Sequence, residues 1–463
     1  DISFLHDQVD ESDLFAANDE DAFAESRFGV VGLKHNLILG ERSYLRTIVS
    51  GSVSGNDFVS DRYTNQGTAE EEVRRVVEAN NTEYRYSVSS FVNQKFNAKF
   101  NARAGILLEQ FNYDLATRNR EYTPDWETLY EFDDNSLLAQ AYVQTQYKLN
   151  KKLTLNTGLH LQGLTLNDNW VLEPRAALNY KANEKNTFSV GYGLHSQYAP
   201  LPILLQQQEV SPGVFEATNT SLKPTRNQHF VLGYDARLAP DWRAKVEAYY
   251  QRLDNVPVDP FASSYSLLNE GAGFTFSENK EGLVNEGTGS NIGLELTIEK
   301  FFSKGYYALI TASLYDSKYT GSDGVERNTA FNNQYVLNVL AGREFKFGKE
   351  QRYAFTLDTK LTTAGGRNYT PVDLEASRVA GREILQDGLA FSEKFDPYFR
   401  WDVKVGMKIN SRKRKLSHHF YFDVQNVTGN ENIFTRRYNR LTNQINDVYQ
   451  LGFFPDFMYR IQF

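Results

Sequence analysis

The sequence FRWDVKVGMKIN, residues 399–410, alternates apolar and polar side chains along its whole length. Successive side chains of a β-strand point to opposite faces, so this stretch has one apolar face and one strongly polar face. It is also longer than the roughly 9–11 residues that a tilted strand needs to cross a bilayer. The stretch therefore predicts a membrane-crossing strand with lipid on one side and water on the other.

Segments with the same alternation recur along the chain, and each predicts a strand of this kind. We predict seventeen strands in all, most of them longer than the strands of ordinary soluble sheets. Their expected ranges are 28–39, 43–62, 84–96, 99–115, 137–149, 153–167, 170–181, 187–198, 227–238, 242–256, 291–302, 306–319, 335–347, 353–363, 398–410, 416–427 and 456–463.

The connections between these segments alternate in length, and only 168–169 breaks the pattern. Outer-membrane barrels have short periplasmic turns and long extracellular loops, whereas Greek-key sandwiches do not sort their loops in this way. The predicted fold class is therefore all-β, an antiparallel up-and-down transmembrane β-barrel. The short turns are 40–42, 97–98, 150–152, 182–186, 239–241, 303–305, 348–352 and 411–415, and the long loops are 63–83, 116–136, 199–226, 257–290, 320–334, 364–397 and 428–455.

The composition excludes several other classes of protein. The chain has 463 residues, with 50 Lys and Arg against 58 Asp and Glu, and a formal net charge of −8. This charge argues against a general nucleic-acid binder, which needs a basic surface. No apolar run approaches the roughly 20 residues of a membrane-spanning helix, and the absence of Cys excludes disulfide scaffolds and thiolate metal sites.

Two segments near the N-terminus carry expectations of their own. Residues 1–27 contain nine acidic residues before the first basic one, Arg27, and we expect a loop there. Residues 68–79 predict a short surface helix, because Thr68 and Glu71 have the spacing of a capping box. Val73, Val76 and Val77 would share one face of that helix.

The strand count predicts an incomplete barrel. If the loop 428–455 is extracellular, strand 456–463 ends in the periplasm, and strand 28–39 runs in the same direction. Direct closure of these two strands would be parallel, and a bilayer tolerates no open sheet edge. We therefore expect residues 1–463 to form one incomplete barrel domain. About five upstream strands would complete a barrel of roughly 22 strands, the size of plugged outer-membrane transporters.

The last strand has apolar residues at every second position and ends on an aromatic residue. These residues are Phe457, Tyr459, Ile461 and Phe463. The pattern resembles the signal that the outer-membrane barrel assembly machinery reads. The resemblance implies that machinery as a partner and the bacterial outer membrane, with its lipid and lipopolysaccharide, as the location.

Seven short motifs occur in order between residues 173 and 455. They are Glu173-Pro174-Arg175, Leu222–Arg226, Tyr249-Tyr250, Asn332–Asn338, Pro397–Asp402, Asp423–Val427 and Gly452–Pro455. Together they resemble the barrel of TonB-dependent receptors, particularly those of Bacteroidetes-like bacteria. The region before residue 170 matches this family only by its alternation pattern.

The resemblance implies a transporter that imports a bulky, scarce nutrient across the outer membrane of a Gram-negative bacterium. A ferric siderophore or another metal chelate is the commonest cargo of that family. Its members carry an N-terminal plug and a segment that binds TonB, and neither is recognisable in these 463 residues. We therefore expect TonB to act through a missing N-terminal region.

No catalytic, cofactor-binding or metal-binding constellation is recognisable, so we predict no enzyme activity and no cofactor. Ligand contacts are expected at the extracellular mouth, where Arg and Tyr suit anionic or aromatic ligands. The same residue types could instead contact lipopolysaccharide or neighbouring loops, and this alternative stays open. The candidate ligand-facing residues are Tyr198, Gln206, Gln207, Gln208, Arg436, Arg437 and Tyr438.

Two other functions are compatible with parts of the pattern. A passive porin-like channel would share the fold but would leave the lumen open. A soluble surface β-protein, such as a glycan-binding module, would have to expose apolar faces far larger than soluble monomers tolerate.

Overall fold

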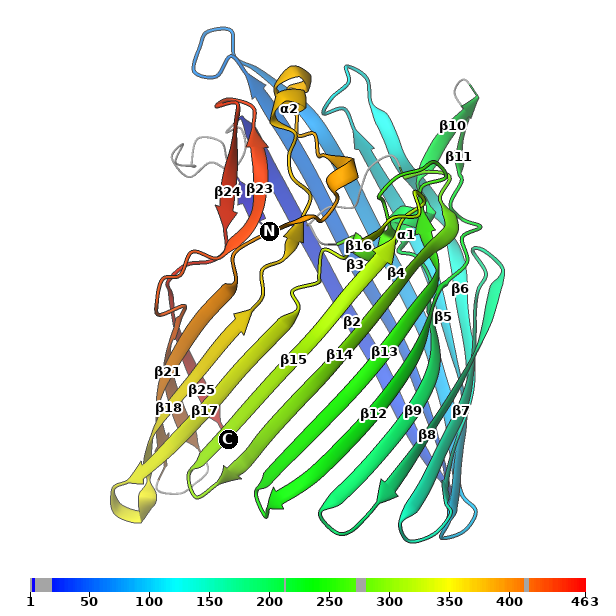
Figure 1. The fold of residues 1–463 in the computed structure, drawn as a ribbon, viewed down its shortest axis with the longest axis vertical. Coiled ribbons are helices and arrows are strands. Elements are labelled where there is room, and N and C mark those ends of the chain that lie inside the picture. Colours follow the sequence, from blue (N-terminus) through cyan, green and yellow to red (C-terminus); the bar gives the residue numbers. More distant parts are fainter. Residues whose placement is uncertain (1, 5–18, 212–213, 272–279, 412–415) are drawn as a thin grey trace.

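The computed structural model describes residues 2–4, 19–211, 214–271, 280–411 and 416–463, and Figure 1 shows its fold. Long tilted strands form the wall, and their bounds follow together with those of the short helices. They are β1 (Ile2–Phe4), β2 (Glu20–Gly40), β3 (Ser43–Thr64), β4 (Glu72–Lys95), β5 (Phe100–Asn119), β6 (Glu127–Lys148), β7 (Leu153–Leu164), β8 (Asn169–Lys181), β9 (Asn186–Gln197), α1 (Leu201–Leu204), β10 (Gln207–Ser211), β11 (Val214–Ala217), β12 (Thr225–Ala239), β13 (Trp242–Val258), η3 (Leu267–Asn269), β14 (Val284–Ser303), β15 (Tyr306–Thr320), β16 (Glu326–Asn328), β17 (Tyr335–Phe347), η4 (Lys349–Gln351), β18 (Tyr353–Ala364), β19 (Asn368–Tyr369), α2 (Leu374–Ala380), η5 (Asp387–Leu389), β20 (Glu393–Lys394), β21 (Tyr398–Asn410), β22 (Ser417–Gln425), β23 (Ile433–Asn439), β24 (Gln444–Tyr449) and β25 (Phe454–Gln462).

Within the described residues, the wall is one antiparallel sheet of 19 strands, of which β1 and β16 are short. The other seventeen pair in sequence order, each with the next long strand along the chain. This is the up-and-down topology that the alternation predicted, and the predicted number of strands is confirmed. Among the described residues, no helix is long and apolar enough to cross a membrane.

The apolar side chains of each alternating strand lie on the outer face of the sheet. One hydrogen-bonded row runs through Val190, Leu232, Ala248, Leu294 and Leu314 on five neighbouring strands. Leu232 and Leu314 are about 60% exposed, at 62% and 60%, although a soluble protein would bury such side chains. Apolar side chains exposed over a whole strand face are what a lipid-facing surface requires.

The polar side chains that alternate with them lie on the inner face. A row three residues further along each strand runs through Gly193, His229, Gln251, Asn291 and Ser317, and an odd offset places it on the opposite face. A one-residue shift in a strand moves its side chains to the opposite face, so the two rows lie on opposite sides of the same sheet. The predicted division into a lipid face and a polar lumen is confirmed.

The predicted helix at 68–79 is wrong. Residues from Glu72 onward belong to β4, which pairs with β3 from Thr64 down to Ser43. The residues that looked like a capping box instead close a turn, in which Glu71 accepts a hydrogen bond from the Gly67 N–H at 2.8 Å. Pairing with the long β3 therefore outweighs the local helix signal, and the β-branched valines at 73, 76 and 77 favour the strand.

Several long strands start or end inside segments that were predicted to be loops. β2 begins at Glu20, inside the expected loop 1–27, of which residues 5–18 lie outside the described residues. β5 and β6 both enter the loop expected at 116–136. These hairpins extend beyond the expected strand ends, and backbone pairing can satisfy their N–H and C=O groups in water as well as in lipid.

The two ends of the sheet remain separate in the described residues. β25 pairs only with β22, and β2 pairs with β3 and with the short β1. Seventeen consecutive antiparallel strands place β2 and β25 in the same direction, as the strand count predicted. The buried apolar clusters lie in the long loops and on the strand ends next to them, since Leu164 belongs to β7 and Tyr113 and Leu115 to β5.

Candidate ligand-binding mouth

The long loops gather at one end of the barrel, and the short turns lie at the other (Figure 1). We call the end with the long loops the mouth. It carries α1, α2, the hairpin β10–β11 and the hairpin β23–β24. This is the sorting of loops that the sequence predicted.

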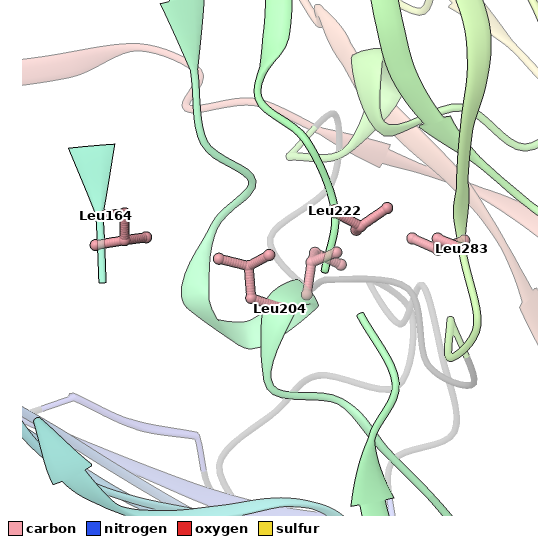
Figure 2. Packing of buried hydrophobic residues seen from close by; sticks show 5 residues of the cluster. Leu164, Leu204, Leu222 and Leu283 are labelled. Carbon is pink, nitrogen blue, oxygen red and sulfur yellow. The ribbon is translucent and has the colours of Figure 1, made fainter. Parts of the chain in front are cut away.

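An apolar cluster fixes the loop that contains α1. It consists of Leu164, Ile203, Leu204, Leu222 and Leu283, all less than 9% exposed, and Figure 2 shows it at close range. Burial of such side chains contributes roughly 1.5–3 kcal/mol each, so the cluster holds this loop firmly against its neighbours. Asn219 connects two segments of this cluster by hydrogen bonds. Its side-chain NH₂ donates to the Ile203 carbonyl at 2.8 Å, and its side-chain carbonyl accepts from the Leu283 N–H at 2.9 Å.

A cavity of about 500 Å³ opens beside this cluster, and we call it the mouth pocket. Part of its wall is an inward row of paired residues, His195, Asn227 and Leu253, which continues to Gly289. Leu268 of η3 lies directly on Gly289, where an added Cβ would come within 2.6 Å of its Cδ1. The glycine therefore lets η3 (Leu267–Asn269) fold inward and cover part of the pocket.

The lining of the mouth pocket combines apolar and polar groups. Leu253, Leu267 and Leu268 supply apolar surface, and His195, Asn227 and Glu270 supply hydrogen-bonding groups. The Oδ1 atom of Asn227 is buried and has no hydrogen-bond partner within the described part of the chain. A pocket of this size with a few polar groups is typical of a small-molecule site.

Tyr198 and Gln207 lie in the loop region around α1. Tyr198 lines the mouth pocket, and its hydroxyl donates to the Asn169 carbonyl at 2.7 Å. Burial raises the pKa of this phenol, so it stays a neutral donor at physiological pH. Gln207 donates to the Glu131 carbonyl at 3.1 Å, and the neighbouring Gln206 is buried and accepts from the Lys280 N–H at 2.7 Å.

Three of the other predicted ligand-facing residues come together on β23, whereas Gln208 lies on β10. Arg436 Nε lies 2.6 Å from Asp447 Oδ1, and this hydrogen bond raises the pKa of the guanidinium. Arg437 Nη1 lies 3.1 Å from Glu383 Oε1. The buried hydroxyl of Tyr438 donates to Asn443 Oδ1 at 2.7 Å. All three side chains therefore contact neighbouring loop residues, and a role in ligand binding stays a prediction.

Sequence reasoning missed Asn227, Leu253 and Leu268 as pocket residues. The first two belong to strands whose ranges were predicted, and the strand parity would have placed Asn227 and Leu253 on the inner face. The inward fold of the loop that brings Leu268 over them has no signature in the sequence.

The residues of the predicted assembly signal lie on the edge strand β25 or directly after it, and their role in assembly stays a prediction. Phe457, Tyr459 and Ile461 are 65%, 47% and 46% exposed, and Phe463 is 99% exposed. Their alternation continues the apolar outer face, since Phe457 and Tyr459 pair with Phe422 and Phe420 of β22.

The family model for the β-barrel of TonB-dependent receptor-like proteins matches residues 4–427. The chain belongs to this family. It is a family of receptor and transporter barrels rather than of enzymes, and these barrels sit in the outer membrane. The family takes its name from its dependence on TonB. No curated protein matches the chain.

Solved structures of TonB-dependent receptors share the fold. The ferric-catecholate import receptor Fiu of E. coli K12 has a TM-score of 0.65 and 10% identity, over 97% of this chain and 65% of its own. The outer-membrane transporter YddB of Escherichia coli has a TM-score of 0.65 and 12% identity, over 96% and 63%. The ferripyoverdine receptor of Pseudomonas aeruginosa has a TM-score of 0.65 and 14% identity, over 96% and 57%. The receptor barrel described here thus spans less than two thirds of the length of each of these proteins.

Proposed function

We propose that this chain is the barrel of a TonB-dependent transporter in the bacterial outer membrane, and that it imports a bulky, scarce nutrient. A ferric siderophore or another metal chelate is the proposed cargo. The observation that carries the proposal is the family match over residues 4–427, together with the apolar outer row and the polar inner row of the wall. The names of two similar receptors, for a ferric catecholate and for ferripyoverdine, support the cargo class.

The proposal includes parts of the protein beyond the described barrel wall. Among the described residues, β2 pairs with β3 and, over Ala22–Ala24, with the short β1, and β25 pairs only with β22. These edges support further strands between them, and a plug would fill the polar lumen. TonB would act on such a plug region, and the barrel assembly machinery would read Phe457, Tyr459, Ile461 and Phe463. Lipid and lipopolysaccharide would surround the apolar face.

An uptake experiment tests the proposal. In the bacterium that carries this gene, its deletion should reduce uptake of radiolabelled ferric catecholate chelates under iron limitation. A plasmid copy should restore uptake, and a protonophore or loss of TonB should abolish it in the restored strain. Unchanged uptake of a panel of ferric chelates would contradict the cargo class.

A conductance measurement separates the transporter from the porin-like alternative. A transporter with an occupied lumen should give no steady current when the full-length protein is inserted into a planar bilayer. Long-lived open channels with ohmic conductance would favour passive diffusion instead.

A further inference from the structure

Three consecutive short turns of the wall share one five-residue pattern, Lys-x-Asn-x-Lys. They are KFNAK (95–99) between β4 and β5, KLNKK (148–152) between β6 and β7, and KANEK (181–185) between β8 and β9. All three lie at the end of the barrel opposite the mouth (Figure 1), which is the periplasmic end of an outer-membrane barrel. The lysines that begin and end each pattern are exposed, and we call them the basic arc. They are Lys95, Lys99, Lys148, Lys152, Lys181 and Lys185.

The central asparagine gives each of the three turns the same shape. Its side-chain Oδ1 accepts hydrogen bonds from the backbone N–H groups two and three residues further along the chain. The distances are 2.8 and 2.9 Å at Asn97, 2.8 and 2.9 Å at Asn150, and 2.9 and 3.0 Å at Asn183. Asparagine fixes a turn in this way because its side chain replaces a backbone acceptor. The three turns therefore present their lysines alike, once in every two strands.

Lysines of neighbouring turns lie side by side. The backbone N–H of Lys148 donates to the Lys99 carbonyl at 2.8 Å, and that of Lys181 donates to the Lys152 carbonyl at 2.7 Å. Like charges that face each other on adjacent strands repel. Among the described residues, one carboxylate pairs with the basic arc, namely Glu184 with Lys181 at 2.9 Å. The other lysines of the arc have no acidic partner there, so most of its positive charge is uncompensated.

The opposite side of the same end of the barrel provides a comparison. There Asp241 lies 3.0 Å from Lys300, and Glu344 lies 2.7 Å from Lys408. Cations near the periplasmic end can therefore be paired within the wall. The basic arc departs from that arrangement, which indicates that its counter-charge comes from outside the chain.

Aromatic side chains on the lipid side show how deep in the membrane the basic arc lies. Phe96 and Phe100 flank the first turn, and their rings are 5.3 Å apart between centres. Tyr180 and Phe188, which pair across β8 and β9 beside the third turn, are 44% and 48% exposed. Aromatic girdles of this kind mark the level at which hydrocarbon gives way to headgroups. The lysines of the same turns therefore lie at headgroup level, where their long apolar stems allow the ammonium groups to reach phosphates.

We propose that the basic arc binds the phosphate groups of anionic phospholipids in the periplasmic leaflet of the outer membrane. A leaflet offers the same negative group repeatedly along the barrel. This suits three copies of one turn better than the irregular surface of an acidic protein does. Each lysine near an anionic bilayer surface adds to the attraction, and salt screens it. The inference needs the barrel to lie in a bilayer, but it does not depend on the cargo.

Native mass spectrometry of the full-length protein in a non-ionic detergent tests the basic arc. The probes are dioleoyl phosphatidylglycerol, which is anionic, and dioleoyl phosphatidylcholine, which has the same acyl chains and no net charge. We expect the anionic lipid to bind at least about fivefold tighter, with a preference that weakens as the ammonium acetate concentration rises. The combined variant Lys99→Gln, Lys152→Gln and Lys185→Gln leaves the three asparagines in place and should abolish this preference. The combined Lys99→Arg, Lys152→Arg and Lys185→Arg variant should keep it, because the charges remain.

The matched control combines Lys223→Gln, Lys360→Gln and Lys394→Gln, which remove the same number of charges outside the basic arc. This control should keep the preference, and heat-modifiable migration on gels should confirm that each variant is folded. Glycerol 3-phosphate carries the phosphate without acyl chains and should not compete at equal concentration. Equal competition would show a site for free phosphate and overturn the lipid site.

Three other results would also overturn the inference. They are no preference in the wild-type protein, an equal loss in the control variant, and a preference that survives in the Lys→Gln variant of the arc. The last result would leave the arc to an acidic protein surface. The assay needs neither TonB nor cargo, so its failure alongside intact uptake would remove this site and leave the proposed function standing.

Discussion

Arg440 Nη2 lies 2.6 Å from both carboxylate oxygens of Asp19, although 421 residues separate the two in the sequence. The same nitrogen lies 3.3 Å from Glu20 Oε1. Arg440 follows β23, in the hairpin that precedes the edge strand β25, and Asp19 immediately precedes the other edge strand, β2. Side chains therefore connect the two edges of the sheet at the mouth, where backbone pairing between them is absent from the described residues.

This contact predicts a coupled effect of two substitutions. Arg440→Gln should make residues 433–449 exchange their amide hydrogens about fivefold faster, which corresponds to about 1 kcal/mol for a partly buried ion pair. Hydrogen exchange with mass spectrometry measures this. Asp19→Asn should produce little additional change in the Arg440→Gln background, and fully additive effects would show that the pair is not energetically coupled.

The two faces of β21 should respond differently to substitution. Val403→Arg places a charge on the apolar outer parity and should cost about 2–4 kcal/mol. Lys404→Ala on the inner face should cost much less. It removes a contact with the ring of Tyr421 at 4.5 Å and a cation between its cross-strand partners Asp358 and Asp423, but it places no charge in lipid. Urea unfolding of the barrel in lipid vesicles gives both values. Equal losses would mean that the faces are assigned wrongly.

Gly366 allows the loop 364–397 to pass close to another part of its own backbone. A Cβ at this position would lie 1.7 Å from the Phe395 carbonyl oxygen, which cannot move as a side chain could. Gly366→Ala should therefore destabilise the loop by about 1–3 kcal/mol or more and expose it to limited proteolysis. Gly388→Ala is the control in the same loop, since a Cβ there meets no atom within 4 Å. Similar cleavage of both variants would contradict this reading of the backbone approach.

The loop 320–334 should be sensitive to acid but not to neutral or basic pH. The Arg327 guanidinium donates to Asp323 at 2.7 Å and holds the pKa of that carboxylate below its ordinary value of about 3.9. A lowered folded-state pKa means that the stabilisation is fully present above the ordinary value. It is lost as the pH falls through the folded pKa. Hydrogen exchange of this loop should therefore accelerate only below about pH 4. Arg327→Gln should shift the onset upward, and an unchanged onset would argue against the pair as its cause.

The last residue should matter for assembly more than its neighbour does. Phe463→Ala removes the terminal aromatic of the outer parity and should lower the amount of folded barrel in outer-membrane fractions several-fold. Gln462→Ala lies on the opposite parity and should have little effect. Heat-modifiability on gels and quantitative blotting measure both variants. Comparable yields for the two would remove the assembly role proposed for Phe463.

The strands of the wall can be predicted because apolar and polar residues alternate along each of them. Trp401, Val403 and Val405, for example, alternate with charged residues and glycine, and this alternation does not depend on the conformation of the loops. Residues 72–79 were misassigned because a four-residue cap signal is local, whereas the pairing with β3 that decides the outcome is remote in sequence. The mouth pocket was not predictable, since its form depends on Leu268 folding back over Gly289. Only Tyr198 of the predicted ligand-facing residues lines it.

The order of the strands has a consequence for how this barrel is made. Every long strand forms its hydrogen bonds with the long strands next to it in sequence. Most backbone contacts therefore join residues that are close in sequence, and they can form before the rest of the chain is in place. The barrel can therefore assemble by sequential addition of β-hairpins, in which each new hairpin pairs with the free edge strand of the hairpin before it. A substitution that prevents one hairpin from pairing should also block the addition of the hairpins that follow it. The yield of barrel assembly should therefore respond more strongly to a defective strand than the free energy of unfolding of the assembled barrel.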